Sequence, residues 1–242
     1  MIVLGFDTAT SATAVGLRLA DGSTLQARDD PAPGAHPGHA TRLLELAHTL
    51  LTEAGIGWSA VERIAVGAGP GTFTGLRVGV ATARGLAQSL EVELVSVSSL
   101  RALAEPAREE AEGAVLAAID ARRGEMFVAG YLAAAAESSN GLESSDELIS
   151  PRALPPEEVG NLLASAGAPW LAVGDGAVRY REQLERAGAM APEDGSPLHL
   201  VSAEAICELG VRATATNAQI EAILPDYRRR PDAEIALEST SR

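Results

Sequence analysis

Asp7 is the first residue of this chain whose type and position suggest chemistry. It follows the apolar run 2–6, which predicts a buried strand, and hydroxyl side chains come after it at Thr8 and Thr10. Carboxylate and hydroxyl oxygens in a loop are suitable ligands for a phosphate-bound metal ion. The alternative is structural, because an aspartate in such a turn also accepts hydrogen bonds from nearby backbone amides.

Asp120 stands in a similar position in the second half of the chain. The runs 115–119 and 126–132 predict two strands that are joined by the turn 120–124. The turn places Asp120 near Arg122, so it could present a carboxylate and a guanidinium at a cleft between two domains. A solvated hairpin turn explains the same residues, and the sequence leaves both explanations open.

A glycine-rich stretch follows the apolar run 63–66 and leads into a long helical pattern. Glycines at 67, 69 and 71 predict a turn, and Thr72 or Thr74 can cap a helix that runs to residue 90. The spacing Gly67-x-Gly69-x-x-Thr72 lacks the third glycine of the dinucleotide-binding fingerprint, and the lysine of a Walker loop is absent. Neither type of nucleotide site is therefore predicted here.

The helix expected over 73–90 has two usable faces. One is a wide apolar stripe, made of Leu76, Val80, Ala83, Leu86, Ala87 and Leu90. The other is flatter and consists of Arg77, Ala81, Arg84 and Gln88. The small residues Gly75, Gly79 and Ala83 also leave a groove where another backbone could approach. We expect one face to pack on the protein's own sheet and the other on a partner.

The histidines and the cysteine do not predict a metal site or a reactive thiol. Pro37 and Gly38 separate His36 from His39 without an acidic residue in a ligand pattern, so His39 is expected to begin a helix over 39–54. Cys207, the single cysteine, lies in an apolar run and predicts a buried, inert thiol. One cysteine excludes an internal disulfide and fits a reducing compartment.

The composition restricts the possible functions further. The net charge of -14 argues against wide, unaided contact with nucleic acid. All 19 basic residues are arginine, so Schiff-base chemistry and a phosphate-binding lysine are both excluded. Because no apolar run reaches the ~18 residues of a membrane span and no targeting segment is recognisable, we expect a soluble cytoplasmic protein without membrane contact.

The remaining pattern alternates strands and helices, which is typical of an α/β protein. Three antiparallel strands are expected at the start, over 2–6, 14–19 and 24–27. Further strands are predicted over 92–97, 147–150 and 170–173, and further helices over 98–104, 155–166, 179–187 and 203–215. The basic cluster 225–231 could contact an RNA or acidic partner groups, or it is a solvated terminus.

Several segments together resemble the bacterial TsaB family, also called YeaZ. The glycine-rich segment GAGPGTFTGLRVGVATARGLA is similar to the hallmark of that family, and GFDTATSATAVGL, HATRLLELAHTLLTEAGI, LVSVSSLRALA and VLAAIDARRGEMFVAGY follow the family's order. The resemblance is dense from residue 2 to 131 and then thins to short pieces. It implies a non-catalytic partner subunit of the complex that transfers a threonylcarbamoyl group to the adenosine next to the anticodon of tRNAs reading ANN codons.

The resemblance also implies which residues would meet a partner. The helices 39–54 and 73–90 would pack on the same helices of the catalytic sister subunit, of the TsaD family. The implied interface residues are Leu43, Ala47, Phe73, Leu76, Arg77, Val80, Ala83 and Arg84. The sister family has two metal-binding histidines at positions that correspond here to Ser99 and Leu103, so this chain resembles the scaffold and neither a catalyst nor a metal protein.

The implied fold is the actin-like ATPase (ribonuclease H-like) fold, with two duplicated lobes whose mixed sheets are flanked by helices. We expect an N-terminal lobe over 1–106, a C-terminal lobe over 107–231 and a disordered tail over 232–242. In active actin-like enzymes a glycine follows two residues after the first aspartate, whereas Ala9 stands here. Asp7, Thr8, Thr10, Asp120 and Arg122 are therefore expected to form a vestigial nucleotide site.

Further partners also follow from the resemblance. A small ATPase subunit of the TsaE family would join the assembly, tRNA would be held indirectly through the complex, and the chain alone would form a homodimer. No cofactor is expected, apart from weak ATP or ADP binding in the complex. The alternative function is an actin-like ATPase that acts on its own; a metalloprotease and a sugar-kinase relative have less support, since their ligand set and phosphate glycines are missing.

Overall fold

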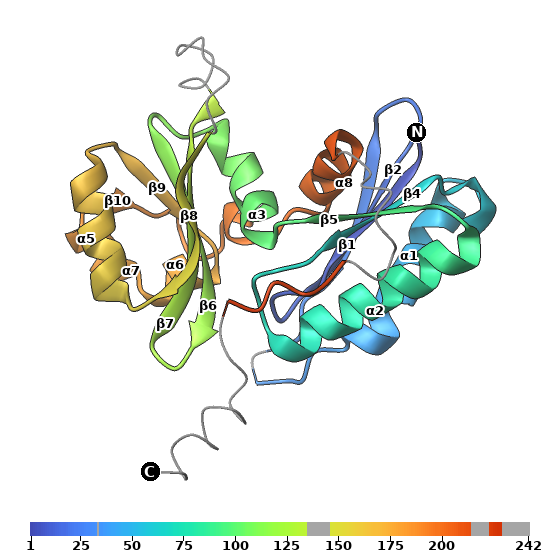
Figure 1. Ribbon diagram of the computed structural model, residues 1–242, viewed down its shortest axis with the longest axis horizontal. Coiled ribbons are helices and arrows are strands. Elements are labelled where there is room, and N and C mark those ends of the chain that lie inside the picture. The colour runs from blue at the N-terminus through green and yellow to red at the C-terminus, as the bar shows by residue number, and fades with distance from the viewer. Residues whose placement is uncertain (33, 135–145, 214–222, 229–242) are drawn as a thin grey trace.

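The computed structural model describes residues 1–32, 34–134, 146–213 and 223–228. Two five-stranded sheets lie side by side, and helices cover their outer faces and fill the space between them (Figure 1). We call the first sheet with its outer helices the first lobe, and the second sheet with its outer helices the second lobe.

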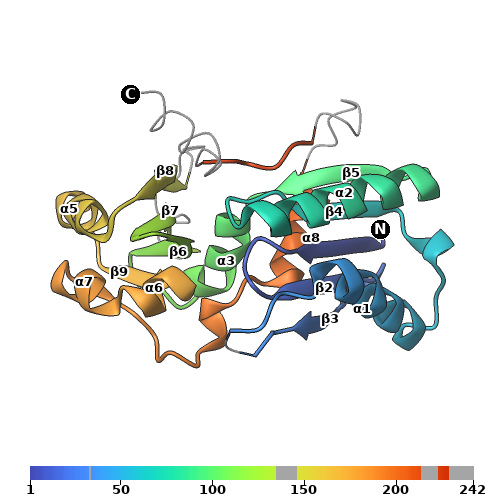
Figure 2. The ribbon, with the colours of Figure 1, turned by 90° about the horizontal axis from the view of Figure 1, so that it is seen from below.

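The first sheet has the spatial order β3-β2-β1-β4-β5, with three antiparallel strands followed by two parallel ones. Its strands are β1 (Val3–Asp7), β2 (Thr13–Arg18), β3 (Thr24–Asp29), β4 (Arg63–Gly67) and β5 (Glu93–Val97). The helices α1 (His39–Glu53) and α2 (Phe73–Leu90) lie side by side on its outer face, and a 3-10 turn, η1 (Trp58–Ala60), precedes β4 (Figures 1 and 2).

The second sheet repeats this connectivity in the order β8-β7-β6-β9-β10. Its strands are β6 (Ala114–Arg122), β7 (Glu125–Leu132), β8 (Glu147–Leu154), β9 (Trp170–Val173) and β10 (Ala189–Met190). The outer elements are the helices α5 (Pro156–Ala166), α6 (Asp175–Arg179) and α7 (Arg181–Arg186), and a 3-10 turn follows as η2 (Pro197–His199). The two lobes are therefore structural duplicates, as predicted.

Two helices lie between the sheets: α3 (Ser99–Arg108) and α8 (Ala203–Arg212) (Figure 2). Gly5 of β1 lies directly against α8, because a Cβ atom at this position would lie 2.7 Å from the Cys207 sulfur. Glycine thus lets α8 approach the sheet closely. One buried core runs from Val3 and Val95 of the first sheet through α3 to Val115 of the second, so the lobes share their packing.

The predicted domain boundary after residue 106 falls in the layer between the two sheets. Residue 106 lies inside α3, which continues to Arg108 despite Pro106 and packs against β6 and β7. Helix α8 was predicted for the second lobe but packs on β1 and β2 of the first. Each helix packs on the sheet of the lobe opposite to its predicted one, because α3 and α8 each bury an apolar face in the layer between the sheets. The predicted tail 232–242 lies outside the described residues.

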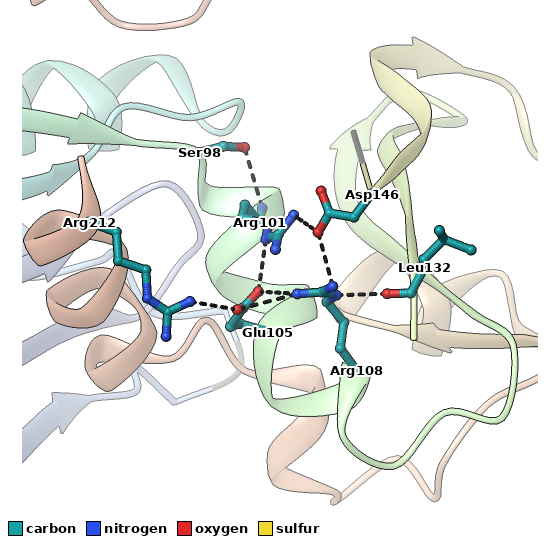
Figure 3. A network of polar contacts seen from close by, with 7 residues as sticks. All are labelled: Ser98, Arg101, Glu105, Arg108, Leu132, Asp146 and Arg212. Atoms are coloured by element: carbon teal, nitrogen blue, oxygen red, sulfur yellow. Dashed lines mark hydrogen bonds and ion pairs between the residues drawn. The ribbon is translucent and has the colours of Figure 1, made fainter. Parts of the chain in front are cut away.

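An ionic network links these central helices to the second lobe (Figure 3). Arg101 and Arg108 of α3 both contact the Asp146 carboxylate, at 2.5 and 3.0 Å. Glu105 lies between them and accepts from the Arg101 Nε at 2.8 Å. Arg212, the last residue of α8, reaches Glu105 at 3.7 Å. Charges from α3, α8 and the segment before β8 therefore meet at one place.

Two predicted elements differ in detail, and one short strand was not predicted. The helix expected over 179–187 is interrupted at Tyr180, which separates α6 from α7. Strand β8 extends past the predicted end at residue 150 and through Pro151. Pro151 has no amide hydrogen to donate, and the register with β7 is irregular just beside it. Strand β10 has only two residues and was not predicted.

Candidate functional site: two loops and a helical face

The Asp7 carboxylate is occupied by hydrogen bonds from the protein itself. Its Oδ1 accepts from the Ala9 amide at 2.7 Å, and its Oδ2 accepts from the Ser99 hydroxyl at 2.5 Å. The Ser99 hydroxyl in turn accepts from the Gly69 amide at 3.2 Å. Burial raises the pKa of the Asp7 carboxyl, against the lowering effect of the Ser99 and Ala9 hydrogen bonds. These contacts fit the structural explanation for this aspartate.

The loop after β1 is packed tightly against the start of α2. The Thr72 amide donates to the Ala9 carbonyl at 2.7 Å, and the Thr8 hydroxyl donates to the Gly75 carbonyl at 2.8 Å. A Cβ atom at Gly71 would lie 2.4 Å from the Ala9 oxygen, so the two backbones touch. The loop after β1 is therefore held directly against the start of α2 by contacts of its own backbone.

Thr10 follows Ala9 in the same loop. Its Oγ accepts from the Ala12 amide at 3.3 Å, within its own turn. The part of the chain that the structure describes contains no cluster of three or more histidine, cysteine or carboxylate side chains that could hold a metal ion.

The second loop is built from Asp120 and the start of α6. The Asp120 amide donates to the Asp175 carboxylate at 2.9 Å, and Asp120 Oδ1 accepts from the Arg122 amide at 2.9 Å. Asp120 Oδ2 faces the guanidinium groups of Arg122 at 3.3 Å and Arg179 at 3.5 Å. Burial raises the pKa of the Asp175 carboxyl. The partners of Asp120 that we find among the described residues thus come from the second lobe, whereas those of Asp7 come from the first lobe and α3.

Five of the eight predicted interface residues prove to be part of the protein's own core. Their side chains are fully or almost fully buried in the cluster between the first sheet and its outer helices, or beside it: Leu43, Ala47, Leu76, Val80 and Ala83. Helical periodicity correctly marks this stripe as buried, but the first lobe itself buries it. In this conformation the five residues cannot be surface contacts for a partner.

The groove of small residues on α2 is also filled from within. A Cβ atom at Gly75 would lie 1.9 Å from the Thr8 carbonyl oxygen, and one at Gly79 would lie 2.4 Å from the Thr8 hydroxyl. The close approach predicted for a second backbone therefore exists, but the approaching segment is the chain's own loop after β1.

The outward surface of α1 and α2 remains available. On α2 the exposed residues include Arg77, Ala81 and Gln88, and on α1 they include Leu44 and His48. Leu44 is 44% exposed, although it is a large apolar side chain. We call this surface the α1–α2 face. Of the predicted interface residues, Phe73 and Arg77 are exposed and Arg84 is half-buried.

The segment 223–228 lies against the first turns of α2. Its Tyr227 ring is 5.3 Å from the Phe73 ring, and the Tyr227 hydroxyl accepts from the Arg77 Nε at 3.1 Å. Arg84 donates to the Ile223 carbonyl. The described part of the predicted basic cluster is therefore folded onto α2 and is not a free, solvated terminus.

The other two candidates for chemistry are structural residues. His39 begins α1, as predicted, and its Nδ1 lies 2.9 Å from the buried Thr13 hydroxyl of β2. Burial lowers the pKa of His39. Burial also raises the pKa of the Cys207 thiol to about 12, which keeps it protonated and unreactive.

Sequence reasoning missed Ser99 and Tyr227 as partners of candidate residues. Ser99 stood out only through its place in the resemblance, and its contact with Asp7 spans 92 residues. Tyr227 belonged to a cluster noted only for its basic charge. Local periodicity contains no signal for either contact.

Two duplicated lobes, with Asp7 at the end of β1 and Asp120 near the end of the equivalent strand β6, define the actin-like ATPase (ribonuclease H-like) fold. Ethanolamine utilization protein EutJ from Carboxydothermus hydrogenoformans has a similar fold at 14% identity, with a TM-score of 0.51 over 86% of this chain and 89% of that one. The family model of TsaD, tRNA N6-adenosine threonylcarbamoyltransferase, matches residues 33–168.

Closer relatives define the family more narrowly. The chain is 35% identical over 177 residues to the tRNA threonylcarbamoyladenosine biosynthesis protein TsaB of Escherichia coli strain K12, covering 73% of this chain and 72% of the relative. The crystal structure of YeaZ from Pseudomonas aeruginosa is 34% identical with a TM-score of 0.73, over 93% of this chain and 99% of that one. The chain belongs to the TsaB family of tRNA threonylcarbamoyladenosine biosynthesis proteins.

Proposed function

We propose that this chain is the non-catalytic partner subunit of a TsaD-family threonylcarbamoyltransferase, and that its α1–α2 face binds that subunit. The observation that carries the proposal is the outward surface of α1 and α2, where Leu44 and Ala81 are exposed although the same helices bury their other face completely. Exposed apolar side chains on paired helices are a common docking surface for another helical protein.

The closed loop at Asp7 supports a non-catalytic role. Both oxygens of the Asp7 carboxylate accept hydrogen bonds from within the protein, and the backbone of Gly71 lies directly against that of Ala9. Ser99 and Leu103, which correspond to the metal-binding histidines of the sister family, are both buried. The chemistry of threonylcarbamoyl transfer then resides in the sister subunit.

The internal hydrogen bonds of Asp7 also count against the alternative function, an ATPase that acts on its own. Such an enzyme would need Asp7 to contact a metal-linked phosphate, and an Asp7→Ala change would abolish its nucleotide affinity. We propose instead that the chain has no cofactor of its own. Weak ATP or ADP binding in the complex would then involve the loop of Asp120 and Arg122, whose guanidinium is exposed.

Further assembly follows from this role. The α1–α2 face would close on a second copy when the sister subunit is absent, because a two-fold homodimer can use one self-complementary patch. A TsaE-family ATPase would join the pair, and tRNA would be held by the complex, since the net charge of this chain is -14. A cytoplasmic location agrees with these partners, and the described residues include no helix able to span a membrane.

The proposal is tested by measuring binding to the TsaD-family subunit of the same organism by titration calorimetry. Ala81→Glu and Leu44→Glu place a carboxylate on the α1–α2 face, and each should weaken binding roughly tenfold or more. Met190→Glu is the matched control, because Met190 is 64% exposed on the second lobe. Unchanged affinity in both face variants, with normal circular dichroism, would contradict the assignment.

A further inference from the structure

Large apolar side chains are exposed at only a few places among the described residues, and three of them belong to one site. Phe73 at the start of α2 is 40% exposed, Tyr227 is 43% exposed and Leu224 is 66% exposed. Phe73 and Tyr227 are in ring contact, and Leu224 stands three residues before Tyr227 on the same short segment. An exposed apolar group of this kind marks a contact surface more often than an isolated side chain does.

The segment 223–228 is held in place by contacts of its backbone and of the Tyr227 and Arg228 side chains. The Asp226 amide donates to the Ala68 carbonyl at 2.7 Å, directly after β4, and Arg84 of α2 donates to the Ile223 carbonyl. Arg228 donates to the Pro151 carbonyl of β8 at 3.1 Å, so the segment spans from the first lobe to the second (Figure 2). The Leu224 side chain is left largely exposed, and the Tyr227 side chain contacts Phe73 and Arg77 but is still 43% exposed.

Arg77 completes this surface. Its guanidinium carbon lies 3.8 Å from the centroid of the Phe73 ring, and its Nε donates to the Tyr227 hydroxyl. Aromatic rings and arginine are the residue types that most often dominate the energy of a protein interface. Arg77 is also an exposed positive charge on a chain whose net charge is -14.

We propose that Phe73, Arg77, Leu224 and Tyr227 form a composite docking surface that extends the α1–α2 face onto the segment 223–228. This inference rests on the proposed function, and the occupant is the same TsaD-family subunit. That subunit would present an apolar surface to Leu224 and the two rings, and a carboxylate to Arg77. Through Arg228 and Pro151, the same contact would connect the bound partner to the second lobe.

The exposure of its apolar side chains indicates that the segment 223–228 forms a docking surface and does not merely shield the start of α2. A segment that merely shielded the start of α2 would turn its apolar side chains inward and leave polar groups outside. Here Leu224 and Tyr227 remain exposed, and Phe73 is still 40% exposed beneath the segment. The segment therefore adds apolar surface to this side of the protein.

The test compares affinities for the TsaD-family subunit. The double change Leu224→Ala and Tyr227→Ala should raise the dissociation constant roughly tenfold to a hundredfold, whereas Met190→Ala on the second lobe should leave it unchanged. In parallel, 4-benzoylphenylalanine in place of Leu224 should crosslink to the partner on illumination, and the same group in place of Met190 should not. A direct crosslink separates contact from an indirect effect of losing the segment.

The outcomes separate this inference from the proposed function. If Ala81→Glu weakens binding while the double alanine variant binds like the wild type and position 224 gives no crosslink, the composite surface is wrong and the proposed function stands. If the wild-type chain does not bind the TsaD-family subunit, both are overturned. Weaker binding of both variants together with the crosslink supports both.

Discussion

The Ser99 hydroxyl donates a 2.5 Å hydrogen bond to the Asp7 carboxylate and at the same time accepts one from the Gly69 amide. Three segments meet there: the end of β1, the turn after β4 and the start of α3. The Ser99 amide also donates to the Gly69 carbonyl at 2.8 Å. A position that could bind phosphate in an enzyme thus serves here to fix the loop on which α2 begins.

Removing the hydroxyl with Ser99→Ala should destabilise the protein by about 1–3 kcal/mol, because the buried Asp7 carboxylate loses a partner and cannot reach water. The measurement is urea unfolding followed by circular dichroism. Ser96→Ala is the control, since Ser96 is exposed on the neighbouring strand β5 and should change the free energy of unfolding little. Equal stabilities of the two variants would mean that the Asp7–Ser99 contact contributes nothing.

The glycines of α2 offer a matched pair of substitutions. Gly75→Ala would place a methyl group 1.9 Å from the Thr8 carbonyl, so we expect it to displace the loop and to lower stability by about 2 kcal/mol or more. Gly85→Ala has no neighbour within 4 Å and should stabilise the helix by roughly 0.5–1 kcal/mol. Thermal unfolding of both variants checks this, and shifts in the same direction would contradict the packing described.

His39 should give the protein a specific dependence on pH. Burial lowers its pKa in the folded state below the ordinary value of 6.5, so the unfolded chain binds the proton more readily. The stabilisation from a neutral His39 is therefore complete above pH 6.5 and is lost as the pH falls through the range down to the folded-state pKa. His39→Gln should unfold with a flatter pH dependence between pH 7 and 5 than wild type. The control His48→Gln changes an exposed residue of the same helix, and its curve should follow wild type.

Arg63 connects the first sheet to the end of α8. Its Nη1 donates to the carbonyls of Gly210 at 2.8 Å, Val211 and Ala213, and its Nη2 lies 2.5 Å from Glu93. Arg63→Met should cost roughly 3 kcal/mol, because it leaves buried carbonyls at the helix end without donors. The exposed pair Arg186–Glu182 is the comparison, and Arg186→Met should change stability by less than about 1 kcal/mol. If the two variants lost the same free energy of unfolding in a urea titration, the contacts of Arg63 would contribute no more than those of an exposed ion pair.

Local patterns were enough to predict most of the architecture. The apolar runs of the predicted strands and the apolar stripe of α2 are properties of neighbouring residues, and the structure confirms the elements that they predict. The resemblance correctly indicated the family and the duplicated fold. Helix α8 was predicted as a helix but assigned to the second lobe, because a local pattern does not specify which sheet buries an apolar face.

The structure also limits which of the predicted interface residues are accessible. The resemblance implied that Leu76 and Val80 meet a partner, whereas the first lobe itself buries both side chains. A Val80→Glu change would therefore test folding and not partner binding, because it puts a charge into the core. Ser99 with Asp7 and Tyr227 with Phe73 depend on contacts across 92 and more than 150 residues, which a single sequence does not reveal.

The most direct test of the central claim is the mass of the assembly in solution. This chain is mixed with the TsaD-family subunit of the same organism, and the mass is measured by light scattering with and without ATP. We predict that a one-to-one complex replaces the homodimer and that Ala81→Glu reduces its formation. A chain that stays apart from the TsaD-family subunit, yet binds or hydrolyses ATP by itself, would contradict the account and move the function to the loop of Asp7.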